Sequence, residues 1–330
     1  MKTRLLSEEP GIGDDRSRDR SVRWPVRKRL ALGAVAVLLL ASRAGAGGAN
    51  LCRQTAQHAA DSCEAGVRSD YLLALGKCDN LRDAADRKAC RQQASADQEE
   101  GMNTCDEQEG AREAACRKLG AAPYDPVIDP ARFVAAIDNP YLPLTPGTTF
   151  IYEGQAAEGP EHRELIVTHN TRDILGVRCV EVRDVVMIND ELEEDTLDWF
   201  AQDVDGNVWY FGENSKQVAD GLIVGLEGTW TAGVDGAKAG IIMEAHNAVG
   251  DFYRQEFSLD TAEDLAEVQS LTESVTVPYG SFSQCLKTVE TTPLNLSDVS
   301  NKFYCPGIGE VLTRDLPAGE SLELVEVRTE

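Results

Sequence analysis

The stretch from Val177 to Glu213 reads VRCVEVRDVVMINDELEEDTLDWFAQDVDGNVWYFGE. Apolar and polar residues alternate in three runs of this stretch, Val177–Ile188, Glu191–Phe200 and Val208–Phe211. Alternation with period two is typical of strands that bury one face. The links Asn189-Asp190 and Asp205-Gly206-Asn207 have the composition of tight hairpin turns. The stretch therefore predicts neighbouring antiparallel strands.

The same pattern extends through most of the C-terminal part of the chain. Further strands are predicted at residues 148–152, 163–168, 221–231, 251–257, 266–277, 281–291, 302–304, 309–313 and 321–327. No segment of helical pattern long enough for a βαβ crossover separates them. This succession favours a strongly curved antiparallel sheet, with a half-barrel or a sandwich as the possible architectures.

A different composition precedes the strands. The region from Gly47 to Leu119 contains no proline, is rich in Ala, Gln and charged residues, and is predicted to be helical. The fold class is therefore α+β, with three segments. Residues 1–46 form an N-terminal extension and signal peptide, residues 47–122 a Cys-rich helical repeat domain, and residues 123–330 an antiparallel β domain.

The helical region contains six cysteines, namely Cys52, Cys63, Cys78, Cys90, Cys105 and Cys116. Their intervals predict a repeat in which each unit is one helix with a cysteine near each end. Two cysteines 11 residues apart share a helix face but stand about 16 Å apart, so disulfides must join different helices. The spacing is also palindromic and would allow nested bridges about a turn near Ala84. Residues 79–89 contain no Gly or Pro, however, which argues against a turn there. Six cysteines allow 15 connectivities, and the sequence does not choose among them.

The N-terminus has the pattern of an export signal. Basic residues from Arg23 to Arg29 precede an apolar run from Leu30 to Ala41, and Ala44-Gly45-Ala46 is a small-residue cleavage site. The run is shorter than the roughly 20 apolar residues that a membrane-spanning helix needs. We expect cleavage near Ala46, a secreted or periplasmic protein, and no transmembrane segment in the mature chain.

The charge of the chain narrows the classes of partner. The formal net charge is −24, and residues 123–330 hold 12 Lys and Arg against 38 Asp and Glu. Such a field repels nucleic acid, so no nucleic-acid partner is expected. The acidic residues from Asp190 to Asp195 are predicted to face water. A protein that binds calcium on its acidic surface is one alternative.

Several motifs of the β region carry a resemblance to a known family. They are Asp138–Leu144, Pro146–Thr148, Ile174–Val177, Asp198–Asp203, Asp205–Glu213, Val277–Phe282 and Pro306–Gly309. Together they resemble a functionally uncharacterised family of exported bacterial proteins. That family is loosely similar to TapB-like proteins and to the curved half-barrels of LolA-like lipoprotein carriers. The resemblance covers residues 129–327 and implies a fold and a compartment, without catalytic residues.

Three further cysteines lie in the β region. Cys179 and Cys285 both stand in the middle of predicted strands, so a bridge between them is expected, with two buried thiols as the alternative. Cys305 would then be left over, unless it pairs with Cys285 or with another cysteine.

Few residues of the chain point to catalysis. It contains four histidines and no nucleophile or metalloprotease motif. Glu244 and His246 form a weak candidate for a metal or acid-base site. The segment from Asp203 to Asn207 looks like a calcium loop, but its glutamate falls one position early, so a hairpin turn is expected. No cofactor is expected.

Aromatic residues supply the candidate ligand contacts of the β region. They are Trp199, Trp209, Phe211, Trp230 and Tyr253, which could hold an apolar ligand on a concave sheet. The sequence favours a non-enzymatic exported binding module for an apolar small molecule or a protein partner. An extracellular hydrolase with an acidic or metal site is the alternative from another class.

Overall fold

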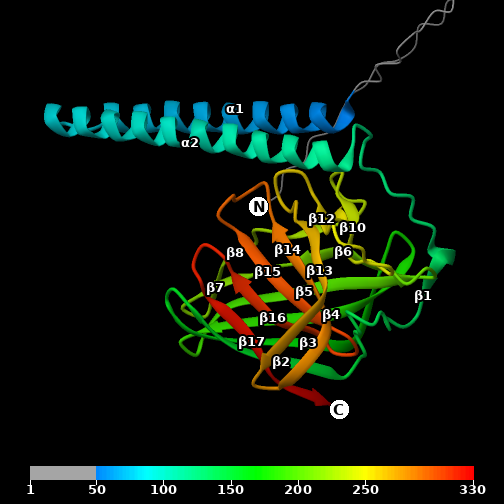
Figure 1. The fold of residues 1–330 in the computed structure, drawn as a ribbon. Coiled ribbons are helices and arrows are strands. Elements are labelled where there is room, and N and C mark those ends of the chain that lie inside the picture. The colour runs from blue at the N-terminus through cyan, green and yellow to red at the C-terminus, as the bar shows by residue number, and fades with distance from the viewer. Residues whose placement is uncertain (1–49) are drawn as a thin grey trace, which may run out of the picture. The chain divides into compact units, whose positions relative to one another are not determined.

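The computed structural model describes residues 50–330, which form two long helices followed by an antiparallel sheet (Figure 1). The helices are α1 (Leu51–Asp79) and α2 (Ala84–Leu119). This arrangement confirms the predicted α+β class. The predicted signal peptide and its cleavage site near Ala46 lie outside the described residues. The division into separate domains stays a prediction.

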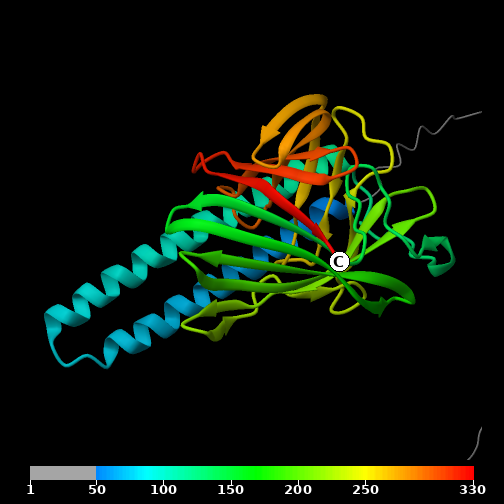
Figure 2. The same cartoon turned by 90° about the horizontal axis from the view of Figure 1, so that it is seen from below.

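The two helices form one antiparallel hairpin rather than a repeat of three cysteine-bearing units (Figure 2). The turn between them needs neither glycine nor proline, because polar side chains cap both helix ends. The Asn80 amide donates a hydrogen bond to the Gly76 carbonyl at 2.9 Å. The Asp83 side chain accepts hydrogen bonds from the backbone N–H groups of Ala85 and Asp86. The predicted helical repeat is therefore corrected to a hairpin.

Three disulfides join the two helices. They are Cys52–Cys116, Cys63–Cys105 and Cys78–Cys90, with Cα–Cα distances of 5.7, 5.7 and 5.5 Å. In an antiparallel hairpin, residues whose numbers have a constant sum lie opposite one another, so the palindromic spacing produces nested bridges. Disulfides persist in oxidising compartments, so the three bridges indicate that this protein is located outside the cytoplasm.

The sheet holds one more bridge, and it is not the expected one. Cys285 is bonded to Cys305, while Cys179 is free and buried. The strand register explains this pairing: Leu286 lies opposite Tyr304, so Cys285 and Cys305 face each other on neighbouring strands. The predicted Cys179–Cys285 disulfide is wrong. Burial raises the pKa of the Cys179 thiol to about 12, which keeps it unreactive.

The sheet has 17 strands, and most of the predicted strand positions are confirmed. Its first strands are β1 (Phe133–Val134), β2 (Thr148–Ala156), β3 (Gly159–Ile174), β4 (Val177–Ile188), β5 (Glu191–Asp203), β6 (Val208–Asn214), β7 (Gln217–Ala219), β8 (Leu222–Gly225) and β9 (Trp230–Thr231). The remainder are β10 (Lys238–Met243), β11 (Phe252–Arg254), β12 (Glu256–Phe257), β13 (Leu265–Val277), β14 (Gly280–Thr291), β15 (Val299–Cys305), β16 (Gly309–Asp315) and β17 (Ser321–Thr329).

The sheet curves until it is nearly closed. Successive strands pair as a meander, the last strand β17 pairs with β2, and β6 pairs with β10. Viewed from below, the orange and red C-terminal strands lie on one side and the green strands on the other (Figure 2). The expectation of a strongly curved single sheet is confirmed. Among the described residues, none of the helices has the length and apolar character needed to cross a membrane.

Gly240 permits the close approach of β10 to the chain that links β11 and β12. A Cβ atom at this position would lie 2.2 Å from the backbone oxygen of Gln255. We expect Gly240→Ala to destabilise the protein by about 1–3 kcal/mol, because the two backbones must move apart. Thermal unfolding measures this effect. Gly66→Ala is the control and should be neutral or stabilising, because a Cβ atom added at this helical position would meet no neighbouring atom within 4 Å.

Candidate functional site

The interior of the curved sheet contains a cavity of about 260 Å³. Its apolar lining includes Leu142, Leu144, Phe150, Leu165, Phe200, Ile242 and Ile308. Its carboxyl groups belong to Asp184, Glu194, Asp198, Glu213, Glu256, Asp264, Glu290 and Glu310. Of the residues that the structure describes, only two with cationic side chains, Arg163 and Lys302, line the same space. The cavity is therefore both apolar and strongly acidic.

The alternation of the strands places these side chains inside. On β5, Thr196, Asp198 and Phe200 line the cavity, while Trp199 between them packs in a hydrophobic cluster on the other face. Side chains two residues apart on a strand share a face. Because of this period, β5 contributes a row of side chains to the cavity that begins with polar residues and ends with the aromatic ring of Phe200.

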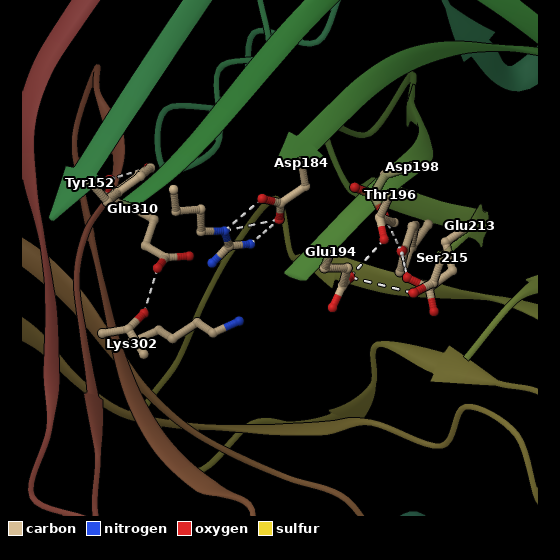
Figure 3. Close-up of polar contacts among 12 residues, drawn as sticks. Tyr152, Asp184, Glu194, Thr196, Asp198, Glu213, Ser215, Lys302 and Glu310 are labelled. Atoms are coloured by element: carbon tan, nitrogen blue, oxygen red, sulfur yellow. Dashed lines mark hydrogen bonds and ion pairs between the residues drawn. The ribbon is translucent and has the colours of Figure 1, made fainter. Parts of the chain in front are cut away.

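The cavity has an apolar end and a polar end. Phe150 on β2 lies opposite Leu165 on β3, and two residues further along Tyr152 lies opposite Arg163. In Figure 3, Tyr152, Lys302 and Glu310 lie on one side of Asp184, and Glu194, Asp198 and Glu213 on the other. A ligand in this space would meet hydrocarbon at one end and charged groups at the other.

The two cations of the cavity are both paired. The Arg163 Nε donates to the two Asp184 carboxylate oxygens at 2.8 and 2.9 Å. The Lys302 Nζ lies 3.0 Å from Glu290, which also accepts a hydrogen bond from the Tyr304 hydroxyl at 3.0 Å. Burial opposes the charged form of Lys302, but the nearby carboxylates outweigh burial and raise its pKa.

The pairing of both cations leaves the other carboxyl groups without a positive partner in the cavity. Tyr210 lies between two of them: its hydroxyl contacts the Asp198 carboxyl and lies 3.1 Å from Glu213 Oε2. One hydroxyl proton cannot satisfy two carboxylates. Burial and the Asp184 charge raise the pKa of Asp198 to about 7. Burial and the Asp198 charge raise the pKa of Glu213 to about 8.

Two more carboxyl groups extend this cluster. Burial and the charge of Asp264 raise the pKa of Glu256 well above its ordinary value. Burial also raises the pKa of Asp264 to about 6. Near neutral pH, part of this cluster holds protons and part is ionised. The cavity can therefore receive a cation, or exchange protons with a ligand.

The aromatic residues chosen from sequence lie elsewhere. Trp199, Phe211 and Trp230 are buried together in one hydrophobic cluster, against which Phe133 packs. Tyr253 is buried in another cluster, which also contains Phe150. The Trp209 indole N–H donates to Asp203 Oδ2 at 2.8 Å and so helps to hold a turn. None of these aromatic side chains lines the cavity. Their role in ligand binding stays a prediction.

The weak metal candidates do not assemble a site. His246 is exposed, and Glu244 is half-buried. Burial and the charge of Asp251 raise the pKa of Glu244 to about 7. Within residues 50–330, no group of three or more His, Cys, Asp or Glu side chains is arranged to hold a metal ion.

The calcium-like segment forms the expected hairpin turn between β5 and β6. The Asp203 carboxylate accepts hydrogen bonds from the backbone N–H groups of Asp205 and Asn207 at 2.9 Å each. The side chains of Asn207 and Trp209 also donate to it. Asp203 is therefore already satisfied by donors of the protein itself.

Glu194 lies inside the curved sheet, whereas the sequence predicts that it faces water. Glu191 and Glu193 are exposed as predicted, but Glu194 lines the cavity, where it accepts a hydrogen bond from the Thr196 hydroxyl at 2.6 Å. The alternation Glu194, Thr196, Asp198, Phe200 was visible in the sequence. That signal could have placed Glu194 on the same face as Phe200, but its charge suggested solvent instead.

Comparison with known proteins gives little further guidance. No family model and no curated protein matches the chain. A solved structure of a "putative lipoprotein" from Parabacteroides distasonis is similar, with a TM-score of 0.32 and 14% sequence identity. The match covers 57% of this chain and 98% of the other. The curved sheet is consistent with a half-barrel, while the resemblance to TapB-like and LolA-like proteins stays a prediction.

Proposed function

We propose that this chain is an exported binding module whose sheet encloses one small amphipathic ligand with a cationic end. The observation that carries the proposal is the lining of the cavity, in which eight carboxyl groups face two cations beside an apolar end. Those carboxyl groups of the cluster that are ionised attract a cation more strongly in a partly buried space than they would in water. The apolar end adds binding energy through burial of hydrocarbon.

The size and chemistry of the cavity suit a small alkylammonium ion. A volume of about 260 Å³ lies near the lower end of ligand sites. The ammonium group would lie among Asp198, Glu213 and Glu256, whose carboxyl groups have no cationic partner in the cavity. The alkyl chain would contact Phe200 and Leu165. The sequence predicts an apolar ligand, and the proposal adds that this ligand carries a positive charge at one end.

Binding of hexylammonium, hexanol and hexanoate tests the proposal. We expect hexylammonium to bind at least tenfold more tightly than hexanol, and hexanoate to bind weakest, because the site repels anions. Calorimetric titration measures the three dissociation constants. Phe200→Ala should weaken both hexylammonium and hexanol by about 1–2 kcal/mol through lost apolar contact.

A charge-specific variant separates the two ends of the site. Asp198→Asn should reduce the preference for hexylammonium over hexanol and leave hexanol binding nearly unchanged. Glu191→Gln, on the exposed part of the same strand, is the matched control and should change neither. Equal affinity for all three probes, or tighter binding of hexanoate, would contradict the proposal.

A hydrolase is a second candidate, favoured by the Asp198, Tyr210 and Glu213 arrangement. A carboxyl group kept protonated near pH 7 beside an ionised carboxylate is a combination that acid-base catalysis uses. Turnover of an ester or glycoside substrate that is lost in Asp198→Asn, with the fold intact, would support this candidate. Hexylammonium would then act as a competitive inhibitor.

A further inference from the structure

A second, smaller cavity lies where the helical hairpin meets the sheet. Its volume is about 120 Å³, and it is lined by residues of α1, α2, the segment 122–124 and the segment 254–263. Arg112 of α2 is hydrogen-bonded to Glu263, which lies in the loop between β12 and β13. Among the lining residues are two arginines, Arg112 and Arg254, and one carboxylate, Glu263.

Arg112 has a donor that the protein leaves unused. Only 4% of this residue is exposed, and its Nε and Nη2 donate to Glu263 at distances of 2.8 to 3.1 Å. The third nitrogen, Nη1, is buried and has no hydrogen-bond partner in the described part of the chain. Buried donors are almost always satisfied, so an unsatisfied guanidinium N–H on a residue that lines a cavity indicates a missing acceptor.

Arg254 contributes a second guanidinium to the same space. It is 8% exposed and stacks on the rings of Phe257 at 4.7 Å and Tyr124 at 5.6 Å. Burial lowers the pKa of Arg254. The charge of Glu263 opposes this shift and the charge of Arg112 adds to it, so both side chains lie close enough to interact electrostatically with Arg254. Glu263 is 1% exposed and is the buried carboxylate they share.

The positive charges of the pocket exceed its buried negative charge. Asp260 lies 3.8 Å from Arg112 Nη2, but its side chain is 59% exposed and does not line the cavity. Within residues 50–330, one buried guanidinium of this pocket thus lacks a buried anion, in a chain whose net charge is −24. Burying an uncompensated charge is costly, and a bound anion would remove that cost.

We propose that this pocket binds a small organic carboxylate, whose oxygens accept hydrogen bonds from Arg112 Nη1 and from the guanidinium of Arg254. Planar guanidinium groups match the two oxygens of a carboxylate. Most of the remaining walls are apolar and include Leu119, Pro123 and Phe257. Those walls favour a carboxylate that carries a short hydrocarbon group over a fully hydrated phosphate. The cavity has the volume of about four water molecules, which suits an acid of the size of propionate.

Titration of the full mature chain with sodium propionate tests this inference. At constant ionic strength, propionate should raise the thermal midpoint and give a saturable calorimetric isotherm. Sodium chloride and inorganic phosphate should give neither. Arg254→Met should weaken propionate binding at least tenfold, because it removes one guanidinium and keeps the apolar stack. Arg314→Met, which removes an arginine stacked on Phe303 at 5.4 Å, is the matched control and should leave binding unchanged.

Two further variants keep the test decisive. If Arg254→Met does not fold, Arg254→Lys retains the charge, loses the planar fork and should still bind propionate more weakly than the unaltered chain. Asp198→Asn, in the larger cavity, should not change propionate binding, which separates this site from the one proposed above. Equal effects of propionate, phosphate and chloride, or full affinity in both Arg254 variants, would overturn the inference.

Discussion

Reduction of the three hairpin disulfides should unfold the turn end of the hairpin, which runs from Cys63 in α1 to Cys105 in α2. The sheet should stay folded. The buried residues of α1 are two cysteines and three alanines, so little hydrocarbon holds the helices together. Burial of a methylene-sized group contributes about 0.8 kcal/mol, whereas a disulfide contributes about 2–4 kcal/mol. Most of the stability of helices in proteins comes from tertiary packing, and little apolar packing joins these two.

Circular dichroism of matched variants measures this dependence. Replacing the Cys63–Cys105 and Cys78–Cys90 pairs by alanine should remove about half of the helical signal, since the distal helices lose both of their cross-links. Cys179→Ala removes a buried cysteine that forms no disulfide and is the control, with full helical signal expected. Tryptophan fluorescence should stay native, because Trp199, Trp209 and Trp230 lie in the sheet. Full helical content without these bridges would show that helix contacts suffice.

Stability should fall as the pH rises from about 5 to 8.5. The pKa of Asp198 is raised to about 7 and that of Glu213 to about 8 in the folded protein. Between the ordinary pKa values near 4 and these raised values, the folded state binds more protons than the unfolded state. The free energy of unfolding therefore decreases with pH in this window, by at most about 1.4 kcal/mol per pH unit for each group.

The thermal midpoint as a function of pH measures this loss. Asp198→Asn should flatten the curve between pH 5 and 8, because the amide does not titrate and can still accept a hydrogen bond from Tyr210. Asp190→Asn changes an exposed aspartate and is the control, which should keep the original slope. Hexylammonium, if it binds the ionised cluster, should bind more tightly at pH 8 than at pH 6. A midpoint that rises over this range would refute the assignment of raised pKa values.

The disulfides show where sequence reasoning ends. The spacing of the six N-terminal cysteines was compatible with a repeat and with a hairpin, because both place cysteines at similar intervals. The choice depends on whether residues 80–83 form a turn, and the caps at Asn80 and Asp83 decide it. In the sheet, Cys179 and Cys285 both stand on strands, but only the register places Cys305 opposite Cys285.

The sequence by itself determined the α+β class, the strands of the sheet from their period-two pattern, and the oxidising compartment from the cysteines. Tertiary structure decided which face of each strand encloses the cavity. On β5 both faces are covered, Trp199 by a hydrophobic cluster and Asp198 by the opposite strands of the nearly closed sheet. Alternation separates the two faces of a strand, but it cannot identify the inner one when both are buried. Closure of the sheet brings carboxyl groups from distant strands together. Their burial in one space raises their pKa values, and no local sequence pattern shows this.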